Sequence, residues 1–580
     1  MKHKVCLLFT FLSLSVSGIS ATNGQDSIRQ IQLSDLEVQI RWVNPTAIRA
    51  YLDDTKTALG GKAPALYEKL SRLETLLPGV RQAFSDKVSS NATDEVIGQA
   101  QEILALKREI ILANPLLDMD KIIVARYRLG NKARKAMGPS MGTSTANYNS
   151  LFSNSRKGYD AEIDLLTGLR GQIESSRIYK PEADVPISDI QLHWDADRLL
   201  FSSLDKNRKW QIYEMNIDGS NLHQKITVDE PDLEFCDANY LPDGKVVATT
   251  NIGYNGVPCV HGDDVVANLV SFAPETRALR RLTFDQDGNW SPIVIPNGRI
   301  MYTRWEYTDL THYFSRIVMH MNPDGSDQKE YYGSNSYWPN SLFNARPLPG
   351  RPGMFAGIVS GHHGVKRLGE LVIFDVNRGR TATEGAVQKI PGYGKPVENV
   401  TRDQLVEGLK TPYFAEPYPL SAETFLAVSS PSGTGGVTNV VWCDVYDNIV
   451  PLTASSYFIY ADPTPLRPRK KPPVLHDRVK PDDKTATVYV SDVYRGRAME
   501  GVPRGEARSL RVFMSEYSPR DTGSHYAMGM ESNWDLKVLY GTVPVNPDGS
   551  AIFTAPANQP LTLQVLDGQG RALALMRSWF

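Results

Sequence analysis

Cysteine, net charge and long apolar runs are all scarce in this sequence. Its 580 residues include 4 cysteines, and 63 basic against 65 acidic side chains give a formal charge of −2. A balance so close to neutral gives no reason to expect nucleic acid or an acidic membrane surface as a partner. Beyond Ala21, no stretch is long and apolar enough to form a membrane-spanning helix. We therefore predict no nucleic-acid partner and no membrane span.

The common signatures of catalysis and cofactor attachment are missing as well. The sequence contains no G-x-S-x-G, no P-loop, no H-E-x-x-H and no EF-hand spacing. It also contains no C-x-x-C-H, so it offers no site for covalent attachment of a c-type haem. We therefore predict no cofactor and no metal, and the sequence leaves open whether the protein is an enzyme.

The first residues have the layout of a secretory signal peptide, which we assign to residues 1–21. Lys2 and Lys4 form a basic end, Val5–Val16 forms a short apolar run, and Ala21 offers a small residue for cleavage. The apolar run is too short to cross a bilayer. This layout predicts export to a periplasm or to the outside of the cell.

Two of the cysteines that remain after such a cleavage could pair. In an oxidising compartment, a tight β unit could bring Cys236 and Cys259 together as a disulfide. Closing a loop of this size would contribute about 3 kcal/mol. Two buried free thiols are one alternative, and a weak metal cluster that includes His261 is another. We predict the Cys236–Cys259 disulfide and leave Cys443 unpaired.

Residues 27–180 are predicted to form a mostly helical N-terminal region. Its clearest helix is capped by Asn91, has acidic residues in its first turn and stops at Asn114–Pro115. After this helix, Lys121–Tyr127 has the β-branched content of a buried strand. We expect the region to pack against the domain that follows.

Weak repeats from 185 to 465 predict a β-propeller. A short apolar strand recurs after a turn signal at intervals of roughly 47 to 70 residues, which suits four-stranded blades with insertions. The recurring strands begin at Leu199, Val246, Ile300, Phe355 and Phe425. A sixth blade can be assembled from Tyr457–Tyr460 and a strand of the N-terminal region. We predict six blades, with five and seven as alternatives.

A Pro-rich basic linker, Pro463–Val474, leads into a β-rich domain at residues 474–580. Alternating strands and a Pro-Asp-Gly-Ser turn at Pro547 predict a compact sandwich-like fold for this domain. The predicted fold class is therefore mainly β: a six-bladed propeller with an N-terminal helical region and a C-terminal β-sandwich-like domain.

Two propeller loops hold the candidate ligand-binding residues. The first combines carboxylates, an imidazole and aromatic rings, which suits a small polar ligand or the edge of a haem, and equally a structured loop between blades. The second is a Gly-flanked histidine pair. Histidine is a common metal ligand and proton shuttle, although one packed and one solvated His would be the structural alternative. The candidates are Trp305, Glu306, Tyr307, Asp309, His312, Tyr313, His362 and His363.

A third stretch, Tyr331–Asn340, mixes aromatic rings with amides. Such surfaces suit the faces of carbohydrates, but they are also ordinary packing inside a propeller. No catalytic residue can be assigned from any of the three stretches.

Several long motifs resemble one family. The runs are FDQDGNWSPIVIPNGRIMYTRWEYTDLTHYFSR, YYGSNSYWPNS, SGHHGVKRLGELVIFD and VPVNPDGSAIFTAPANQPLTLQVLDGQGRALALMRSWF. They are similar to the alpha subunit of hydrazine synthase and its relatives, and the Asp-Gly turns resemble TolB-type propeller repeats. The resemblance spans about Ile103 to Phe580. It implies a front domain, a central propeller that corresponds to the middle domain of that subunit, and a carboxyl-terminal domain.

Two departures separate the sequence from this family. Relatives commonly continue past the Met576–Trp579 motif into a C-x-x-C-H haem site, which the sequence lacks. Gly288 also stands where the family pattern has His. The resemblance therefore implies the fold but not the haem-dependent synthesis of hydrazine. Either this branch has lost the haem or the sequence is shorter than those of its relatives.

Our first functional hypothesis is a binding or scaffold component of a periplasmic or extracellular assembly, acting on unknown protein partners or a small ligand. The second is an oxidoreductase-related subunit whose haem is lost or supplied by a partner. The third is a carbohydrate-binding or polysaccharide-processing propeller.

Overall fold

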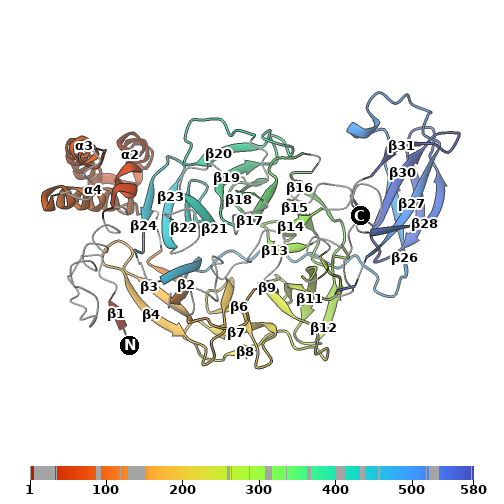
Figure 1. Cartoon of the computed structure of the whole chain (residues 1–580), viewed down its shortest axis with the longest axis horizontal. Coiled ribbons are helices and arrows are strands. Elements are labelled where there is room, and N and C mark those ends of the chain that lie inside the picture. Colours follow the sequence, from red (N-terminus) through yellow and green to blue (C-terminus); the bar gives the residue numbers. More distant parts are fainter. Residues whose placement is uncertain are drawn as a thin grey trace.

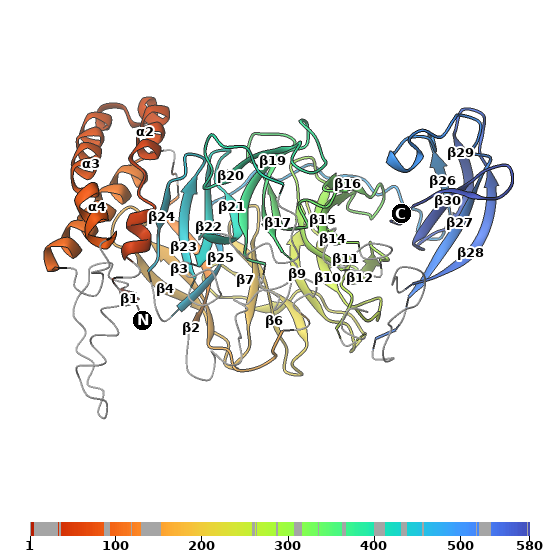
Figure 2. The same ribbon diagram turned by 45° about the horizontal axis from the view of Figure 1, so that its top comes forward.

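The computed structural model describes residues 2–4, 33, 36–85, 93–115, 117, 119–128, 152, 154–257, 262, 264–285, 288–306, 316–334, 336–361, 367–399, 412–430, 438–454, 458–517, 519–520, 535–576 and 578–580. They form a helical domain, a propeller and a C-terminal β domain (Figure 1). The helices lie at one end of the molecule and the C-terminal strands at the other (Figure 2). This arrangement confirms the predicted, mainly β fold class.

The helical domain contains α2 (Pro45–Leu59), the short turn η1 (Gly60–Lys62), α3 (Ala63–Ser85) and α4 (Asp94–Leu112). Asn44 caps α2 and Thr93 caps α4 through side-chain oxygens that accept backbone N–H groups. The predicted cap, Asn91, lies outside the described residues. The apolar faces of the helices meet in one core. No helix in the described part of the chain is long and apolar enough to cross a membrane.

Five blades of the propeller follow one another along the chain, and each is a four-stranded antiparallel meander. The first strands of neighbouring blades contact one another and therefore lie innermost. The blades are β5 (Ile187–Leu192), β6 (Arg198–Leu204), β7 (Trp210–Asn216) and β8 (His223–Gln224); β9 (Phe235–Tyr240), β10 (Val246–Thr250), β11 (Asn268–Ala273) and β12 (Ala278–Arg281); β13 (Asn289–Val294), β14 (Ile300–Trp305), β15 (Arg316–Met321) and β16 (Lys329–Tyr332); β17 (Ser341–Pro347), β18 (Met354–Ser360), β19 (Glu370–Asp375) and β20 (Ala386–Ile390); and β21 (Tyr413–Pro419), β22 (Thr424–Ser430), β23 (Asn439–Asp444) and β24 (Ile449–Pro451).

The sixth blade closes the ring with strands from both ends of the propeller. β25 (Phe458–Pro465) is its innermost strand, followed by β2 (Lys121–Arg128), β3 (Ala161–Thr167) and β4 (Glu174–Tyr179). β1 (Lys2–Lys4) pairs with the outer edge of β4. The composite sixth blade predicted from the sequence is thus confirmed. The propeller takes in residues 121–179, which were predicted to belong to the N-terminal region.

Buried charges hold the closing blade together. Arg126 of β2 is 3% exposed and contacts Glu162 and Asp164 of β3, while Arg177 of β4 also contacts Glu162. Burial opposes ionisation of Glu162, but the two guanidiniums outweigh it and lower the pKa of this carboxyl group. Arg126 is shared by both carboxylates, so removing Arg126 would leave the buried Asp164 without the cation that it contacts.

The C-terminal domain consists of two small sheets. β26 (Thr485–Val490) pairs with β29 (Ala551–Pro556), and the second sheet has the order β28 (Asp535–Pro544), β27 (Ser509–Tyr517), β30 (Leu561–Leu566) and β31 (Ala572–Leu575). Side chains of both sheets share a core, and the turn η5 (Arg497–Met499) packs beside it. The sandwich-like fold predicted for this domain is therefore confirmed.

The segment between the propeller and the C-terminal domain is anchored along the propeller. Arg469 stacks over the Trp194 ring at 5.0 Å, and its backbone N–H donates to the Trp194 carbonyl at 2.8 Å. Further along, the Asp324 carboxylate accepts the N–H groups of Arg478 and Val479. The basic linker predicted from the sequence therefore lies partly against the protein surface.

The helical domain packs against the blade that runs from β21 to β24. Tyr51 of α2 meets Trp442 of β23 edge-on, with ring centroids 5.7 Å apart. Asp444, at the end of β23, is fully buried and accepts two backbone N–H groups and the Asn448 side-chain amide. Lys107 of α4 approaches from the helical side and interacts with Asp444 across the junction.

Replacing Asp444 by Asn should change how stability depends on pH. Burial raises the pKa of Asp444 from 3.8 to about 7, so between these pH values the folded chain keeps a proton that the unfolded chain releases. Stability of the parent protein therefore falls as pH rises through this window, by up to about 1.4 kcal/mol per pH unit from this group. Burial lowers the pKa of Lys107 to about 8, so Lys107 titrates above the window.

Denaturant unfolding at about pH 4.5 and about pH 7.5 measures this effect. D444N should gain stability relative to the parent protein as pH rises, whereas the exposed control Asp229→Asn should track the parent at both values. Parallel pH curves for D444N and the parent protein would show that Asp444 is not held protonated by burial.

Candidate functional site

Each innermost strand of the propeller carries one polar residue with left-handed backbone geometry. These residues are Asp189 (φ 58°), Asp237 (φ 53°), Ser291 (φ 52°), Asn344 (φ 50°), Glu416 (φ 51°) and Asp462 (φ 52°). Such geometry is uncommon for residues other than glycine. Its recurrence at one position in six blades shows that the position is built into the fold.

A β-bulge explains the repeated geometry. In every blade, two residues of the innermost strand oppose a single residue of the second strand, and the polar residue is the first of the two. A bulge re-aims its side chain and bends the strand. In β5, for example, Asp189 and Ile190 together oppose Phe201. The six bulges turn their polar side chains toward the propeller axis.

The six residues line one axial cavity of about 30 Å³. This volume accommodates about two water molecules. Gln191, Arg346, Tyr418 and Thr464 complete the polar part of the lining. The cavity is therefore large enough for an ion with a little water but too small for an organic substrate.

The carboxylates of the axial cavity accept backbone N–H groups from the next blade around the ring. Asp189 Oδ2 accepts the N–H of Asp237 at 3.1 Å, and Asp237 Oδ2 accepts that of Ser291 at 2.6 Å. Glu416 Oε2 accepts the N–H of Asp462 at 2.6 Å, and Asp462 accepts that of Ile190. The carboxylates thus satisfy backbone groups exposed by the bulges, but Asp462 Oδ2 is buried without a hydrogen-bond partner.

The electrostatics of the axial cavity disfavour full ionisation. Burial, with a smaller contribution from Asp189, raises the pKa of Asp237 to about 7. Burial also raises the pKa of Glu416 to about 7, and burial together with Glu416 raises the pKa of Asp462 well above its ordinary value. Close carboxylates that share a desolvated space bind protons or cations readily.

Two guanidiniums moderate this negative charge. Arg346 lines the cavity and lies over the Tyr418 ring at 5.2 Å. Arg367 stacks on Trp290 and Phe343 at 5.1 and 5.0 Å, and its charge favours ionisation of Asp237. Burial lowers the pKa of both arginine side chains. They compensate only part of the charge on the four carboxylates.

The loops predicted to bind a ligand are only partly described. β14 and β18 are the second strands of neighbouring blades, so their C-terminal ends lie on the same side of the ring. The predicted residues Tyr307, Asp309, His312, Tyr313, His362 and His363 lie outside the described residues. Their roles stay predictions.

Trp305 takes part in the packing of the propeller core. Its side chain is completely buried, 6.3 Å from the Trp290 ring and beneath the Arg316 guanidinium at 4.5 Å. This packing accounts for the burial of the ring, and the predicted role of Trp305 in ligand binding stays a prediction. The same packing explains Gly288, where the family pattern has His. A Cβ atom at Gly288 would lie 2.2 Å from the Trp290 ring.

Glu306, also predicted as a ligand-binding residue, contacts the C-terminal tail of the chain. The Glu306 carboxylate accepts a hydrogen bond from Ser578 Oγ at 2.6 Å. Trp579 lies under the Arg304 guanidinium at 4.3 Å, and its indole N–H donates to the buried carboxylate of Asp285. The site built around Glu306 therefore joins the propeller to the C-terminal domain.

Cys236 is a free, buried thiol. Its neighbours are apolar side chains that include Val257, Trp290 and Phe343, and burial raises the pKa of the thiol well above its ordinary value. The free thiol of Cys236 disagrees with the predicted disulfide to Cys259, and Cys259 itself lies outside the described residues. Cys443 is also free and buried.

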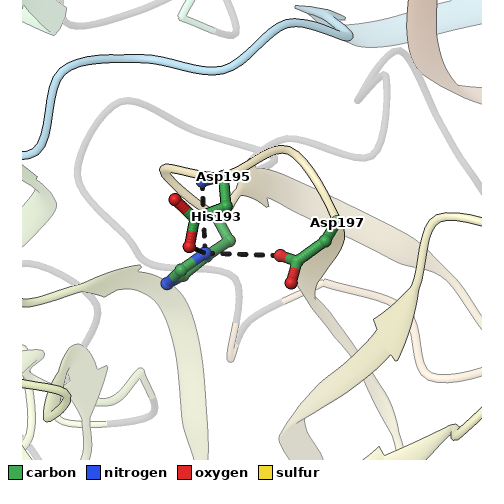
Figure 3. A group of neighbouring side chains, drawn as sticks. All are labelled: His193, Asp195 and Asp197. Carbon is green, nitrogen blue, oxygen red and sulfur yellow. Dashed lines mark hydrogen bonds and ion pairs between the residues drawn. The ribbon is translucent and has the colours of Figure 1, made fainter.

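A possible metal-binding trio lies outside the axial cavity, in the turn between β5 and β6. His193 Nδ1 is 3.4 Å from carboxylate oxygens of both Asp195 and Asp197 (Figure 3). Arg198 NH2 lies 2.7 Å from His193 Nε2, and Arg198 also pairs with Asp197 at 2.8 Å. The guanidinium already supplies the positive charge that a cation would bring, so the trio is explained without a metal.

Comparisons with known proteins agree with the fold. The family model described as the hydrazine synthase alpha subunit middle domain matches residues 505–580. Hydrazine synthase of Kuenenia stuttgartiensis superposes with a TM-score of 0.60 at 15% identity, over 80% of this chain and 67% of that one. The chain is similar to the hydrazine synthase alpha subunit. The resemblance predicted from the sequence is thus confirmed, and at this identity it establishes a shared fold.

The matched region of the family model lies in the C-terminal β domain, whereas the resemblance was expected to place the middle domain at the propeller. TolB from Acinetobacter baumannii is similar at a lower level, with a TM-score of 0.37 at 13% identity over 66% of this chain and 71% of that one. No curated protein matches the chain.

Replacing Trp579 by Ala should loosen the contact between the C-terminal tail and the propeller. Removing a buried tryptophan costs about 3–5 kcal/mol in a protein core, and here it would also leave Asp285 and Arg304 without their aromatic partner. Hydrogen exchange should become at least about tenfold faster in peptides that cover 299–306 and 561–576. The rest of the propeller should be unaffected.

Phe580→Ala is the matched control for this experiment. Phe580 is adjacent in the chain but 45% exposed, and its interactions with Leu561 are made by backbone atoms. It should therefore leave exchange unchanged. If W579A and F580A behave alike, the tryptophan does not anchor the tail.

Proposed function

We propose that the protein is an exported binding and scaffold component of a periplasmic or extracellular assembly, and that its axial cavity holds a hydrated divalent cation. The observation that carries the proposal is the cavity itself, where four carboxylates, an amide and a hydroxyl converge from six blades. Carboxylate and carbonyl oxygens are the preferred ligands of Mg²⁺ and Ca²⁺.

Charge supports a divalent ion in particular. When Asp189, Asp237, Glu416 and Asp462 are ionised, they exceed Arg346 and Arg367 by two negative charges. Asp462 Oδ2, which is buried without a hydrogen-bond partner, is available to a cation. A divalent ion would neutralise the excess without any movement of the ring.

Geometry supports an ion that keeps part of its water. No three of the described cavity carboxylates bring oxygen atoms within 4.8 Å of one another. Direct coordination by three carboxylates is therefore not preformed. The cavity has room for about two water-sized occupants in total, so a bound ion would keep about one water, which would bridge it to carboxylates that it does not contact directly.

The scaffold part of the proposal is supported by the way the flanking domains attach. The helical domain buries Tyr51 and Lys107 against one blade, and the tail around Trp579 is buried against another. The ring between them is closed by strand pairing. Such a ring holds two separate surfaces at a fixed distance, which is what a component of a larger assembly requires.

Titration calorimetry on protein freed of divalent ions tests the axial site. Mg²⁺ or Ca²⁺ should bind once per chain, and Asp462→Asn should weaken binding at least about tenfold because it removes the free carboxylate oxygen. Asp197→Asn is the matched control, since it removes a carboxylate of the His193 trio instead. Loss of binding in D197N alone would move the site to that trio, and a parent protein that binds neither ion would overturn the proposal.

Export is tested by the N-terminus of the mature protein. Expressed with its full sequence in a bacterial host, the chain should be recovered from the periplasm or medium, beginning at Thr22 by mass spectrometry. Cleavage would remove β1 and leave the closing blade with four strands, like the other five. Recovery of an uncleaved chain from the cytoplasm would contradict the export assignment.

A further inference from the structure

The axial cavity lies toward one end of the propeller ring. Each of its lining residues is either a bulged residue of an innermost strand or one of the two residues that follow it. In five blades the residue two positions after the bulged residue lines the cavity, and these residues are Gln191, Ile293, Arg346, Tyr418 and Thr464. The cavity is therefore displaced toward the end of the ring where the innermost strands finish.

Packed side chains close the opposite end of the axis. Cys236, Trp290 and Phe343 come directly before three of the bulged residues, are at most 2% exposed, and belong to one apolar core. Arg367 stacks on the rings of Trp290 and Phe343. Because protein interiors are packed as densely as organic crystals, a hydrated ion would not pass through this core. An ion in the axial cavity would reach solvent through the end where the innermost strands finish, which we call the mouth.

The linker to the C-terminal domain crosses the mouth. It leaves the sixth blade after Pro465, and its Pro473 carbonyl lies so close to Gly298, in the β13–β14 turn, that a Cβ atom at Gly298 would clash with it. In a ring of six, the blade that begins with β13 stands opposite the sixth blade, three places away in either direction. The segment Leu466–Pro473, which we call the strap, therefore spans the ring from one side to the other (Figure 1).

Proline makes the strap stiff. Pro468, Pro472 and Pro473 are three of its eight residues. Pro-rich segments extend by about 3.1 Å per residue and keep their direction over several residues, so the strap reaches about 25 Å. Such a segment moves away from the mouth only when its attachments to the blades break.

Two arginine side chains attach the strap to the rim of the mouth. The Arg467 guanidinium donates to the carbonyl of Leu420, which follows directly on β21, at 3.0 Å. The Arg469 guanidinium donates to the carbonyl of Leu192, the last residue of β5. Arg469 also stacks over the Trp194 ring, and its backbone N–H donates to the Trp194 carbonyl. Both guanidiniums thus hold the strap at the ends of innermost strands.

The strap also brings positive charge to an acidic mouth. Burial lowers the pKa of Arg346 in the cavity wall, and the Arg469 guanidinium lowers it further, so these two cations lie close enough to interact. A cation that enters the mouth would meet the charge of Arg469 before it reaches the four carboxylates. Moving the strap aside removes this electrostatic barrier together with the steric one.

We propose that the strap gates the exchange of cations between the axial cavity and solvent, and that Arg469 is the residue that keeps it closed. This inference rests on the cation site proposed for the axial cavity and adds the route to it. A cation enters or leaves when Arg469 releases Leu192 and Trp194. Such a gate slows entry and release by the same factor, because it blocks one path in both directions and leaves the bound state unchanged.

Release of the bound ion, Ca²⁺ or Mg²⁺, tests the gate. Loaded protein is mixed in a stopped-flow instrument with an excess of a fluorescent chelator, and titration calorimetry gives the equilibrium affinity. Arg469→Lys keeps the positive charge but loses the stacking and the planar donor geometry of the guanidinium. R469K should release the ion at least about tenfold faster, while its affinity changes by less than about twofold.

Lys470→Arg is the matched control, because Lys470 is the next residue of the strap and is exposed. K470R should release the ion at the rate of the parent protein. Hydrogen exchange at the backbone amide of position 469 reports movement of the strap without any cation. Exchange of this amide should be at least about tenfold faster in R469K than in the parent protein or in K470R.

The outcomes distinguish the strap from the cation site. If the parent protein binds the ion and R469K releases it at the parent rate, the gate is overturned and the cation site stands. Faster release with an equal loss of affinity would mean that Arg469 acts on the bound state, which also overturns the gate. A parent protein that binds neither ion would overturn the site and the gate together, and calorimetry shows this before any rate is measured.

Discussion

The pairing of β25 with β2 is the interaction on which the rest of the structure depends. A four-stranded blade cannot bury its own faces, so each blade takes its core from its neighbours and the ring is stable only when it is closed. The closing pair joins the strand after the helices to the strand before the C-terminal linker. The helical domain and the linker are therefore both attached to this blade. Beyond it, Arg469 of the linker contacts Trp194, and Trp579 of the C-terminal tail contacts Arg304.

Closure of the propeller ring also determines which polar groups meet at the propeller axis. Six innermost strands approach one another there, and the bulge in each exposes a backbone N–H that needs an acceptor. Carboxylates such as Asp189 and Asp237 meet this need for the following blade. The same solution gathers negative charge in a small desolvated cavity, which opposes ionisation. Bound protons or a cation relieve the conflict, so the structural role and the proposed binding role of these residues arise from one constraint.

More of the fold than of the candidate site could be predicted from the sequence. Recurring strands at Leu199, Val246 and Ile300 mark the second strand of each blade, because that strand is buried on both faces and reads as an apolar run. The axial residues lie in the first strands, where the shared pattern is a short polar residue followed by Pro or a small or apolar residue, as in Glu416-Pro417 and Asp462-Pro463. That pattern is visible only once the blades are aligned, since a bulge disturbs the simple alternation that marks a strand.

The surroundings of Arg304 and Glu306 show why composition alone could not locate a site. Aromatic rings beside carboxylates predicted a ligand site here, and in the structure the charged side chains of Asp285, Arg304 and Glu306 do form a binding surface. What it binds is Trp579 of the same chain, because the C-terminal domain has to be held by specific contacts if it is not part of the ring. The sequence contains both halves of this contact, but they are far apart along the chain and only the closed ring brings them together. A surface that recognises an indole within one chain uses the same physical interactions as one that recognises a ligand, so the two can be told apart only by finding the occupant.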